Sequence, residues 1–209
     1  TDEAGRVTKL TYDKENRLTR VDNALNQFQT FVYDNNGNKI EEKDWNGNMT
    51  TFVYDSNDRL IERHEPEGRS IIFTYDELGN KLSESLPFTS GSIAVSQTTH
   101  FEYDPLNRVI KTINAELGVS TFTYDGEGNK LSQTDAENRT TLFEYDPLNR
   151  LIKVTNAAGS ISRIEYDANG NKTAEIDANG NKRSTVYDPL NRPAKISNAL
   201  GHITNQLYD

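Results

Sequence analysis

Histidines are the side chains from which an acid–base or nucleophilic site is most readily built, because imidazole titrates near neutral pH. His64, His100 and His202 lie far apart in the 209-residue sequence. No nucleophile-elbow or comparable motif accompanies them. Aspartate and glutamate together number 32, so some carboxylates approach each other in any fold and their proximity indicates little. The sequence therefore predicts a protein without enzymatic activity.

Two acidic segments, Asp167–Asn171 and Asp177–Asn181, have the composition of a calcium loop and both read Asp-Ala-Asn-Gly-Asn. A helix–loop–helix calcium site has glycine at its sixth position and a bidentate glutamate at its twelfth. Here glycine is fourth, and no such glutamate follows. Turn capping explains the same residues without a metal, so we expect no metal and no cofactor, with calcium as the alternative. Cysteine is absent, which excludes a thiolate site and a disulfide framework.

The spacing of the tyrosines shows how the chain is organised. All ten are followed by aspartate, and eight of the nine intervals are 21 residues. The interval from Tyr75 to Tyr103 is 28 residues, and its seven-residue excess near 86–92 predicts a protruding loop, in which Phe88 is the contact residue to test. Self-similarity at a fixed period indicates a tandem array. The structural repeat markers are Tyr12, Asp13, Tyr33, Asp34, Tyr54, Asp55, Tyr75, Asp76, Tyr103, Asp104, Tyr124, Asp125, Tyr145, Asp146, Tyr166, Asp167, Tyr187, Asp188, Tyr208 and Asp209.

Turn chemistry recurs twice in each unit. Tyrosine is followed by Asp-x-x-Gly or Asp-Pro-Leu-Asn, as at Asp34–Gly37 and Asp104–Asn107, and Asx-x-x-Gly/Asn returns some ten residues later, as at Asp44–Gly47. Aspartate caps a type I turn, proline presets φ, and Gly or Asn tolerates the left-handed conformation that returns the chain to a strand. Strand-forming residues lie between the turns, as in Thr50–Tyr54. We therefore predict an all-β chain of about nineteen short strands that form a continuous antiparallel β-hairpin strip.

Phenylalanine stands two residues before tyrosine in six units. Residues two apart on a strand share a face, so the sequence predicts an aromatic column along one side of the sheet. Each pair in the column would add up to ~1 kcal/mol between neighbouring units. The alternative is an aromatic strip on which sugars stack. The column lapses at Thr185 and Gln206, and its phenylalanines are Phe31, Phe52, Phe73, Phe101, Phe122 and Phe143.

A second period of 42 residues is superimposed on the first. Units alternate between Asn-Arg-Leu, as at Asn149–Leu151, and Gly-Asn-Lys, as at Gly128–Lys130. The residue after the turn is thus apolar in one unit and charged in the next. We expect alternate units to place this position in different environments, such as the inner and outer surfaces of a curved sheet. An alternating salt-bridge ladder of little energetic value is the second interpretation.

Composition favours a thin structure. Hydrophobic residues make up 33% of the chain, and even with glycine included the apolar share stays below the ~45–50% usual in globular domains. We interpret residues 1–209 as one array, a segment of a longer chain. A formal net charge of −9 disfavours a nucleic acid or an anionic membrane as partner. No apolar run reaches the ~18–20 residues of a membrane span.

The Tyr-Asp marker, its 21-residue spacing and the alternating Asn-Arg-Leu and Gly-Asn-Lys units resemble the Rhs/YD-repeat family over essentially the whole chain. The family includes bacterial Rhs proteins, wall-associated proteins, the C components of insecticidal Tc toxin complexes and animal teneurins. The resemblance implies a β-strip that spirals into a hollow Rhs β-shell, which in toxin members encloses a C-terminal toxic domain. The self-cleaving core segment that follows the repeats in that family has no match here, so the resemblance stops at the repeats.

Two functions agree with these features. The first is a structural, non-catalytic segment of a β-shell that encapsulates a polypeptide cargo such as a C-terminal toxin domain. The second is an extracellular binding module that recognises carbohydrate or a cell-surface protein through the repeat surface. The partners implied are further YD repeats of the same chain or a second copy at an exposed sheet edge, an encapsulated toxin, or a glycan. We expect a protein that is secreted or at the cell surface, of bacterial origin.

Overall fold

Antiparallel β-strands make up almost the whole of the described chain, as the turn and strand signals predict. The computed structural model describes residues 7–90 and 93–208. Within them the only helical element is one 3₁₀ turn, η1 (Pro66–Gly68). The strands are β1 (Lys9–Tyr12), β2 (Leu18–Asp22), β3 (Phe28–Tyr33), β4 (Lys39–Lys43), β5 (Met49–Tyr54), β6 (Leu60–His64), β7 (Ser70–Tyr75), β8 (Lys81–Ser90), β9 (Ile93–Tyr103), β10 (Val109–Ile113), β11 (Val119–Tyr124), β12 (Lys130–Thr134), β13 (Thr140–Tyr145), β14 (Leu151–Thr155), β15 (Ile161–Tyr166), β16 (Lys172–Ile176), β17 (Lys182–Tyr187), β18 (Pro193–Ser197) and β19 (Ile203–Asn205).

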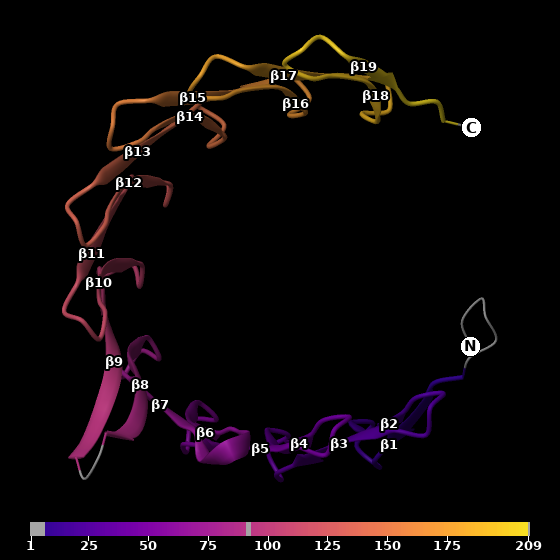
Figure 1. Cartoon of the computed structure of the whole chain (residues 1–209), viewed down its shortest axis with the longest axis vertical. Helices are drawn as coiled ribbons and strands as arrows, with labels where there is room; N and C mark the ends of the chain where they lie inside the picture. The colour runs from indigo at the N-terminus through magenta and orange to yellow at the C-terminus, as the bar shows by residue number, and fades with distance from the viewer. Residues whose placement is uncertain (1–6, 91–92, 209) are drawn as a thin grey trace. The chain divides into compact units, whose positions relative to one another are not determined.

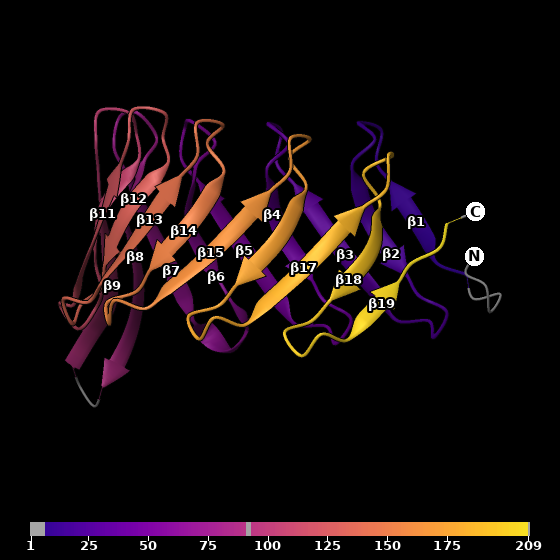
Figure 2. The same ribbon diagram turned by 90° about the horizontal axis from the view of Figure 1, so that it is seen from above.

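The strands belong to one nineteen-stranded sheet. From β1 to β9 and from β11 to β19, each strand pairs with the next along the chain. The chain divides into two compact units, residues 1–108 with 112–117, and residues 109–111 with 118–209. Within each unit the strands lie side by side in chain order (Figure 1). Seen from above, the strands of a unit are inclined in the same sense (Figure 2). The predicted class, an all-β strip of consecutive antiparallel hairpins, is confirmed.

The sheet is a single layer without a thick core. Among the described residues only Ile71 and Ala174 are buried hydrophobics, with 7% and 3% of their surfaces exposed. Most strand residues are half-buried, as in β2, β4 and β14. Stability must therefore come from contacts between neighbouring strands and turns rather than from a closed apolar interior.

A β-bulge precedes the marker tyrosine in the hairpins that lead into a Tyr-Asp turn. In the hairpin of β7 and β8, Thr74 pairs with Ser83, but the next pair is Tyr75 with Lys81, so Leu82 is the extra residue. The same shift recurs between β13 and β14, where Tyr145 pairs with Leu151. A bulge bends the strand and increases its twist. In these hairpins the bulge also places the first strand residue after the Tyr-Asp turn directly opposite the marker tyrosine.

The described part of the seven-residue excess, residues 86–90, belongs to a strand and not to the predicted loop, while residues 91 and 92 lie outside the described residues. β8 and β9 are ten and eleven residues long, and their pairing continues without a shift from Ser83 opposite His100 to Ser90 opposite Ile93. Figure 2 shows this pair reaching beyond the neighbouring turns. For the described residues the loop prediction was wrong, because residues 86–90 continue the cross-strand pairing of the hairpin with residues 93–97. Phe88 pairs with Val95, and its side chain lies outside the described residues.

Candidate functional site

The carboxylate of each marker aspartate from Asp13 to Asp188 organises the turn that follows it. Asp13 accepts hydrogen bonds from the backbone N–H groups of Glu15 and Arg17, at 3.0 and 2.9 Å, and from Arg17 Nε at 2.8 Å. The backbone N–H of Asn16 donates to the Asp13 carbonyl at 3.1 Å, and Asn16 is left-handed with φ 62°. In Gly-Asn-Lys units glycine takes this position, as at Gly37 with φ 95°. The predicted turn chemistry is confirmed at these positions.

These donors hold the pKa of the turn carboxylates below the ordinary value. For Asp13 the backbone N–H of Arg17 is the largest cause, and the hydrogen bond and charge of its guanidinium add to it against the opposing effect of partial burial. The Arg150 side chain is the main cause of the lowered pKa of Asp146. Donors to the charged form favour that form. The aspartates are therefore ionised structural acceptors at neutral pH.

The marker tyrosines join each unit to the preceding one. Tyr33 Oη donates to the Leu18 carbonyl oxygen at 2.9 Å, and Tyr54 Oη donates to the Lys39 carbonyl oxygen at 3.0 Å. The acceptor lies 15 residues earlier, or 22 where the seven-residue excess intervenes. The sequence argument placed tyrosine in an aromatic column and missed this role of the hydroxyl. A signal was present, because all ten marker positions carry tyrosine and none carries phenylalanine. The eight tyrosines with this bond are Tyr33, Tyr54, Tyr75, Tyr103, Tyr124, Tyr145, Tyr187 and Tyr208.

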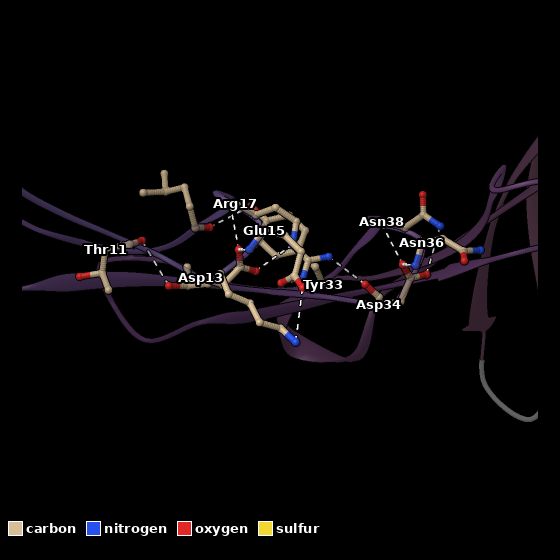
Figure 3. A network of polar contacts seen from close by, with 11 residues as sticks. Thr11, Asp13, Glu15, Arg17, Tyr33, Asp34, Asn36 and Asn38 are labelled. Carbon is tan, nitrogen blue, oxygen red and sulfur yellow. Dashed lines mark hydrogen bonds and ion pairs between the residues drawn. The ribbon is translucent and has the colours of Figure 1, made fainter.

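Arginine makes the contact from an Asn-Arg unit to the unit after it. Arg17 Nη1 donates to the Asp34 carbonyl at 3.0 Å, while its guanidinium lies over the Tyr33 ring at 5.0 Å from the centroid. Figure 3 shows this arginine held between its own turn aspartate, Asp13, and the following turn at Asp34. Arg59 and Arg150 repeat the contact, at 2.7 and 3.2 Å from the next aspartate carbonyl. A cation over an aromatic ring adds about 0.5–1 kcal/mol at such half-exposed sites.

The Gly-Asn-Lys units use different groups for their forward contact. Asn38 Nδ2 donates to Asp58 Oδ1 at 2.6 Å, and Asn129 Nδ2 donates to Asn149 Oδ1 at 2.9 Å. The lysine of the same unit lies between two phenylalanine rings of the column. Lys130 Nζ is 5.7 and 4.9 Å from the centroids of Phe122 and Phe143. The 42-residue period therefore alternates two kinds of connection between units.

The expectation that alternate units place the residue after the turn in different environments is wrong. Leu18, Lys39 and Leu60 pair with the marker tyrosines Tyr12, Tyr33 and Tyr54 in the same register. The bulge fixes one slot on one face, which accepts either leucine or the stem of a lysine.

The aromatic column itself is half-buried, and lysines lie over it. Lys39 is shared by Phe31 and Phe52, and Lys81 lies 5.7 and 4.8 Å from the ring centroids of Phe73 and Phe101. Lys172, next to the lapse at Thr185, pairs with the residue three positions on, Glu175, just as Lys39 and Lys81 pair with Glu42 and Glu84, but 46% of its side chain is exposed, against 35% and 33% for those two lysines. The two lysines that lie between phenylalanine rings are thus more covered than the one that lacks them.

Among the described residues, no hydrogen bond or ion pair joins two histidines. His64 Nδ1 is 2.8 Å from Ser70 Oγ, and His64 Nε2 is 3.6 Å from Glu62 Oε1. The second distance is too long for the hydrogen bond that orients a catalytic imidazole. Among residues 7–90 and 93–208, no group of three or more His, Cys, Asp or Glu residues is arranged to hold a metal. In the same part of the chain, no helix has the length and apolar character needed to cross a membrane.

These contacts and the fold define a tandem β-hairpin repeat protein whose units are joined through their turns and tyrosines. The model of the RHS Repeat family matches four segments that together cover more than half of the chain, residues 12–49, 54–90, 124–161 and 166–203. The chain belongs to the RHS repeat family. Each matched segment begins at a marker tyrosine and spans nearly one 42-residue pair of units. Comparison with curated proteins gave no match.

Solved structures of Tc toxin proteins share the fold. The crystal structure of TcdB2-TccC3 aligns with 91% of this chain at a TM-score of 0.56 and 14% identity, and that of TcdB2-TccC3 without its hypervariable C-terminal region aligns with 91% at 0.56 and 15%. The Photorhabdus luminescens Tc holotoxin pore with the TccC3-D651A mutation aligns with 96% at 0.50 and 16% identity. The chain spans only 13%, 13% and 14% of the lengths of these chains.

Proposed function

We propose that this chain is a non-catalytic wall segment of a β-shell that encapsulates a polypeptide cargo, such as a C-terminal toxin domain. One observation carries the proposal. In both compact units of the chain, successive repeats are joined by tyrosine hydroxyl bonds and by arginine or asparagine contacts between their turns. Such a strip resists separation of neighbouring strands without an apolar core, which is what a thin wall requires.

The similar structures support the proposal at the level of fold. One of them is a Tc holotoxin pore, and another is described as lacking a hypervariable C-terminal region. We infer by analogy that a variable polypeptide associated with the repeats is the cargo here. We also place the protein outside the cytoplasm, secreted or at a cell surface. This role asks nothing of the repeat side chains beyond wall contacts, in keeping with a non-catalytic array.

The binding-module alternative draws less support from the aromatic column. Sugar stacking requires an open ring face, but lysine ammonium groups lie over the rings of Phe31, Phe52 and Phe101. Carbohydrate recognition would have to use another part of the surface.

The proposal is tested on the full natural polypeptide that contains these repeats. Limited proteolysis followed by mass mapping should find the non-repeat polypeptide protected in the intact protein and digested when it is produced alone. Replacing Tyr124 and Tyr145 by phenylalanine should shorten that protection, because both hydroxyl bonds between units are lost. Equal cleavage rates for the cargo inside and outside the intact protein would overturn encapsulation. Specific binding of the repeats to a glycan array, without such protection, would favour the alternative.

A further inference from the structure

Several departures from the repeat pattern lie together in the compact unit formed by residues 1–108 and 112–117. The long pair β8 and β9 is one of them. The turn before β7 contains Glu67 with φ 69°, and the turn before β11 contains Leu117 with φ 65°. At the other left-handed turn positions the chain uses glycine, asparagine or Asp58. A bulky side chain with positive φ is strained, and such strain collects at functional sites.

A groove of about 600 Å³ lies among these departures. Its apolar lining comes from Ile71 of β7, Leu86 of β8 and Phe101 of β9, and Ile71 is 7% exposed. Gln97 and Thr99 of β9 supply an amide and a hydroxyl. The register places Thr99 opposite Glu84, so the groove crosses the sheet from strand to strand. The two flanking turns contribute Arg69 at one side and Asn114–Glu116 at the other.

The groove has unbalanced negative charge. Arg69 is the one cation among its lining residues, and its Nε is bonded to Glu65 Oε2 at 2.6 Å. Glu84 Oε2 accepts from Lys81 Nζ at 2.7 Å. The carboxylate of Glu116 forms no ion pair among the described residues. In a chain of net charge −9, this carboxylate favours a cationic partner over a phosphate-bearing one.

We propose that this groove binds an extended segment of the cargo polypeptide, with an apolar side chain against Ile71 and Leu86 and a neighbouring lysine or arginine beside Glu116. The amide of Gln97 and the hydroxyl of Thr99 can bond the main chain of the segment. A peptide fits better than a sugar, because Lys81 lies 4.8 Å from the centroid of the Phe101 ring and covers it. The identity of the partner rests on the encapsulation proposed above, whereas the chemistry of the groove does not.

The test uses the 209-residue chain and a blocked, fluorescein-labelled octapeptide, Gly-Ser-Leu-Lys-Leu-Lys-Ser-Gly, followed by anisotropy. Two matched peptides replace either both lysines by glutamate or both leucines by serine. Glu116→Lys should weaken binding of the first peptide about tenfold, since an attraction becomes a repulsion. Glu77→Lys is the control, because Glu77 is an exposed glutamate in the turn between β7 and β8, at the other end of these strands from the turn that holds Glu116. This variant should change the affinity less than twofold. Circular dichroism checks that both variants keep the sheet.

The outcomes separate the two proposals. Binding that needs lysine and leucine in the peptide and Glu116 in the chain supports the groove. The groove proposal would be overturned if the first peptide did not bind, or if Glu116→Lys and Glu77→Lys lost the same affinity for it. It would also be overturned if the serine peptide bound as tightly as the first peptide. Cargo protection from protease is measured independently, so a wall without a peptide groove, or a groove without encapsulation, would each be recognised.

Discussion

Removing the hydroxyl of a marker tyrosine isolates the connection between two units. In Tyr75→Phe the ring remains, and the hydrogen bond from Tyr75 Oη to the Leu60 carbonyl oxygen, 2.8 Å long, is lost. A neutral hydrogen bond of this kind contributes ~0.5–1.5 kcal/mol net. We therefore expect the free energy of unfolding to fall by about 1 kcal/mol, which corresponds to roughly 2–4 °C in Tm for a chain of this size.

The array offers a test of additivity. Tyr33 and Tyr75 are two units apart, so four strand spacings of ~4.8 Å separate them by roughly 19 Å. Sites farther apart than ~7–10 Å contribute independently. The double variant Tyr33→Phe/Tyr75→Phe should accordingly lose about 2 kcal/mol.

Tyr166 is the matched control within the chain. Its ring contacts Arg150 at 4.6 Å, but its hydroxyl forms no hydrogen bond among the described residues. Tyr166→Phe should change the free energy of unfolding by less than about 0.3 kcal/mol, since no bond is broken. Urea unfolding followed by far-UV circular dichroism measures all the variants, provided that the slope with denaturant stays constant. Equal losses for Tyr75→Phe and Tyr166→Phe would refute the role assigned to the hydroxyl.

Two further predictions concern the turns. Gly128→Val should cost about 1–2 kcal/mol, because Gly128 has φ 92° and valine resists the left-handed region; Gly126→Ala, two residues earlier with open space around its added methyl group, is the control, and an unchanged urea midpoint for Gly128→Val would contradict the turn assignment. N–H donors of Arg108, Arg150 and Arg192 lower the pKa values of Asp104, Asp146 and Asp188. The stability that these ionised aspartates contribute should therefore be complete above the unfolded pKa of ~3.9, and it should be lost as the pH falls through their folded pKa values. Urea midpoints between pH 7 and pH 2 should then drop less in the triple variant Asp104→Asn/Asp146→Asn/Asp188→Asn than in the native chain, and parallel curves would contradict this cause.

Most of the fold can be predicted from the sequence, because the residues that determine it act locally. The segment Asp104–Asn107 predicts its turn through a capping carboxylate, a proline and a residue that tolerates positive φ. Each of these side chains acts within four residues. Strand length follows, because the two turns of a unit leave only five or six residues between them.

Contacts between units could not be read in the same way. The tyrosine at every marker position signals the donor of the bond from Tyr54 to the Lys39 carbonyl, but the acceptor is a main-chain oxygen 15 residues earlier, so no residue type marks the acceptor. The bulge before tyrosine likewise has no fixed residue, although it decides that leucine and lysine occupy one slot. The groove beside β8 and β9 depends on strands, turns and an insertion that meet only after folding.

The tyrosine hydroxyl bonds to a group that every amino acid possesses. Its acceptors belong to residues as different as Lys39, Val109 and Pro193. A duplicated stretch of gene therefore encodes a unit that already fits its neighbour, whatever side chain follows the turn. The alternation of arginine and asparagine contacts adds one condition, that units be gained or lost in pairs. Recombination can thus lengthen or shorten such an array in steps of 42 codons without designing a new interface each time.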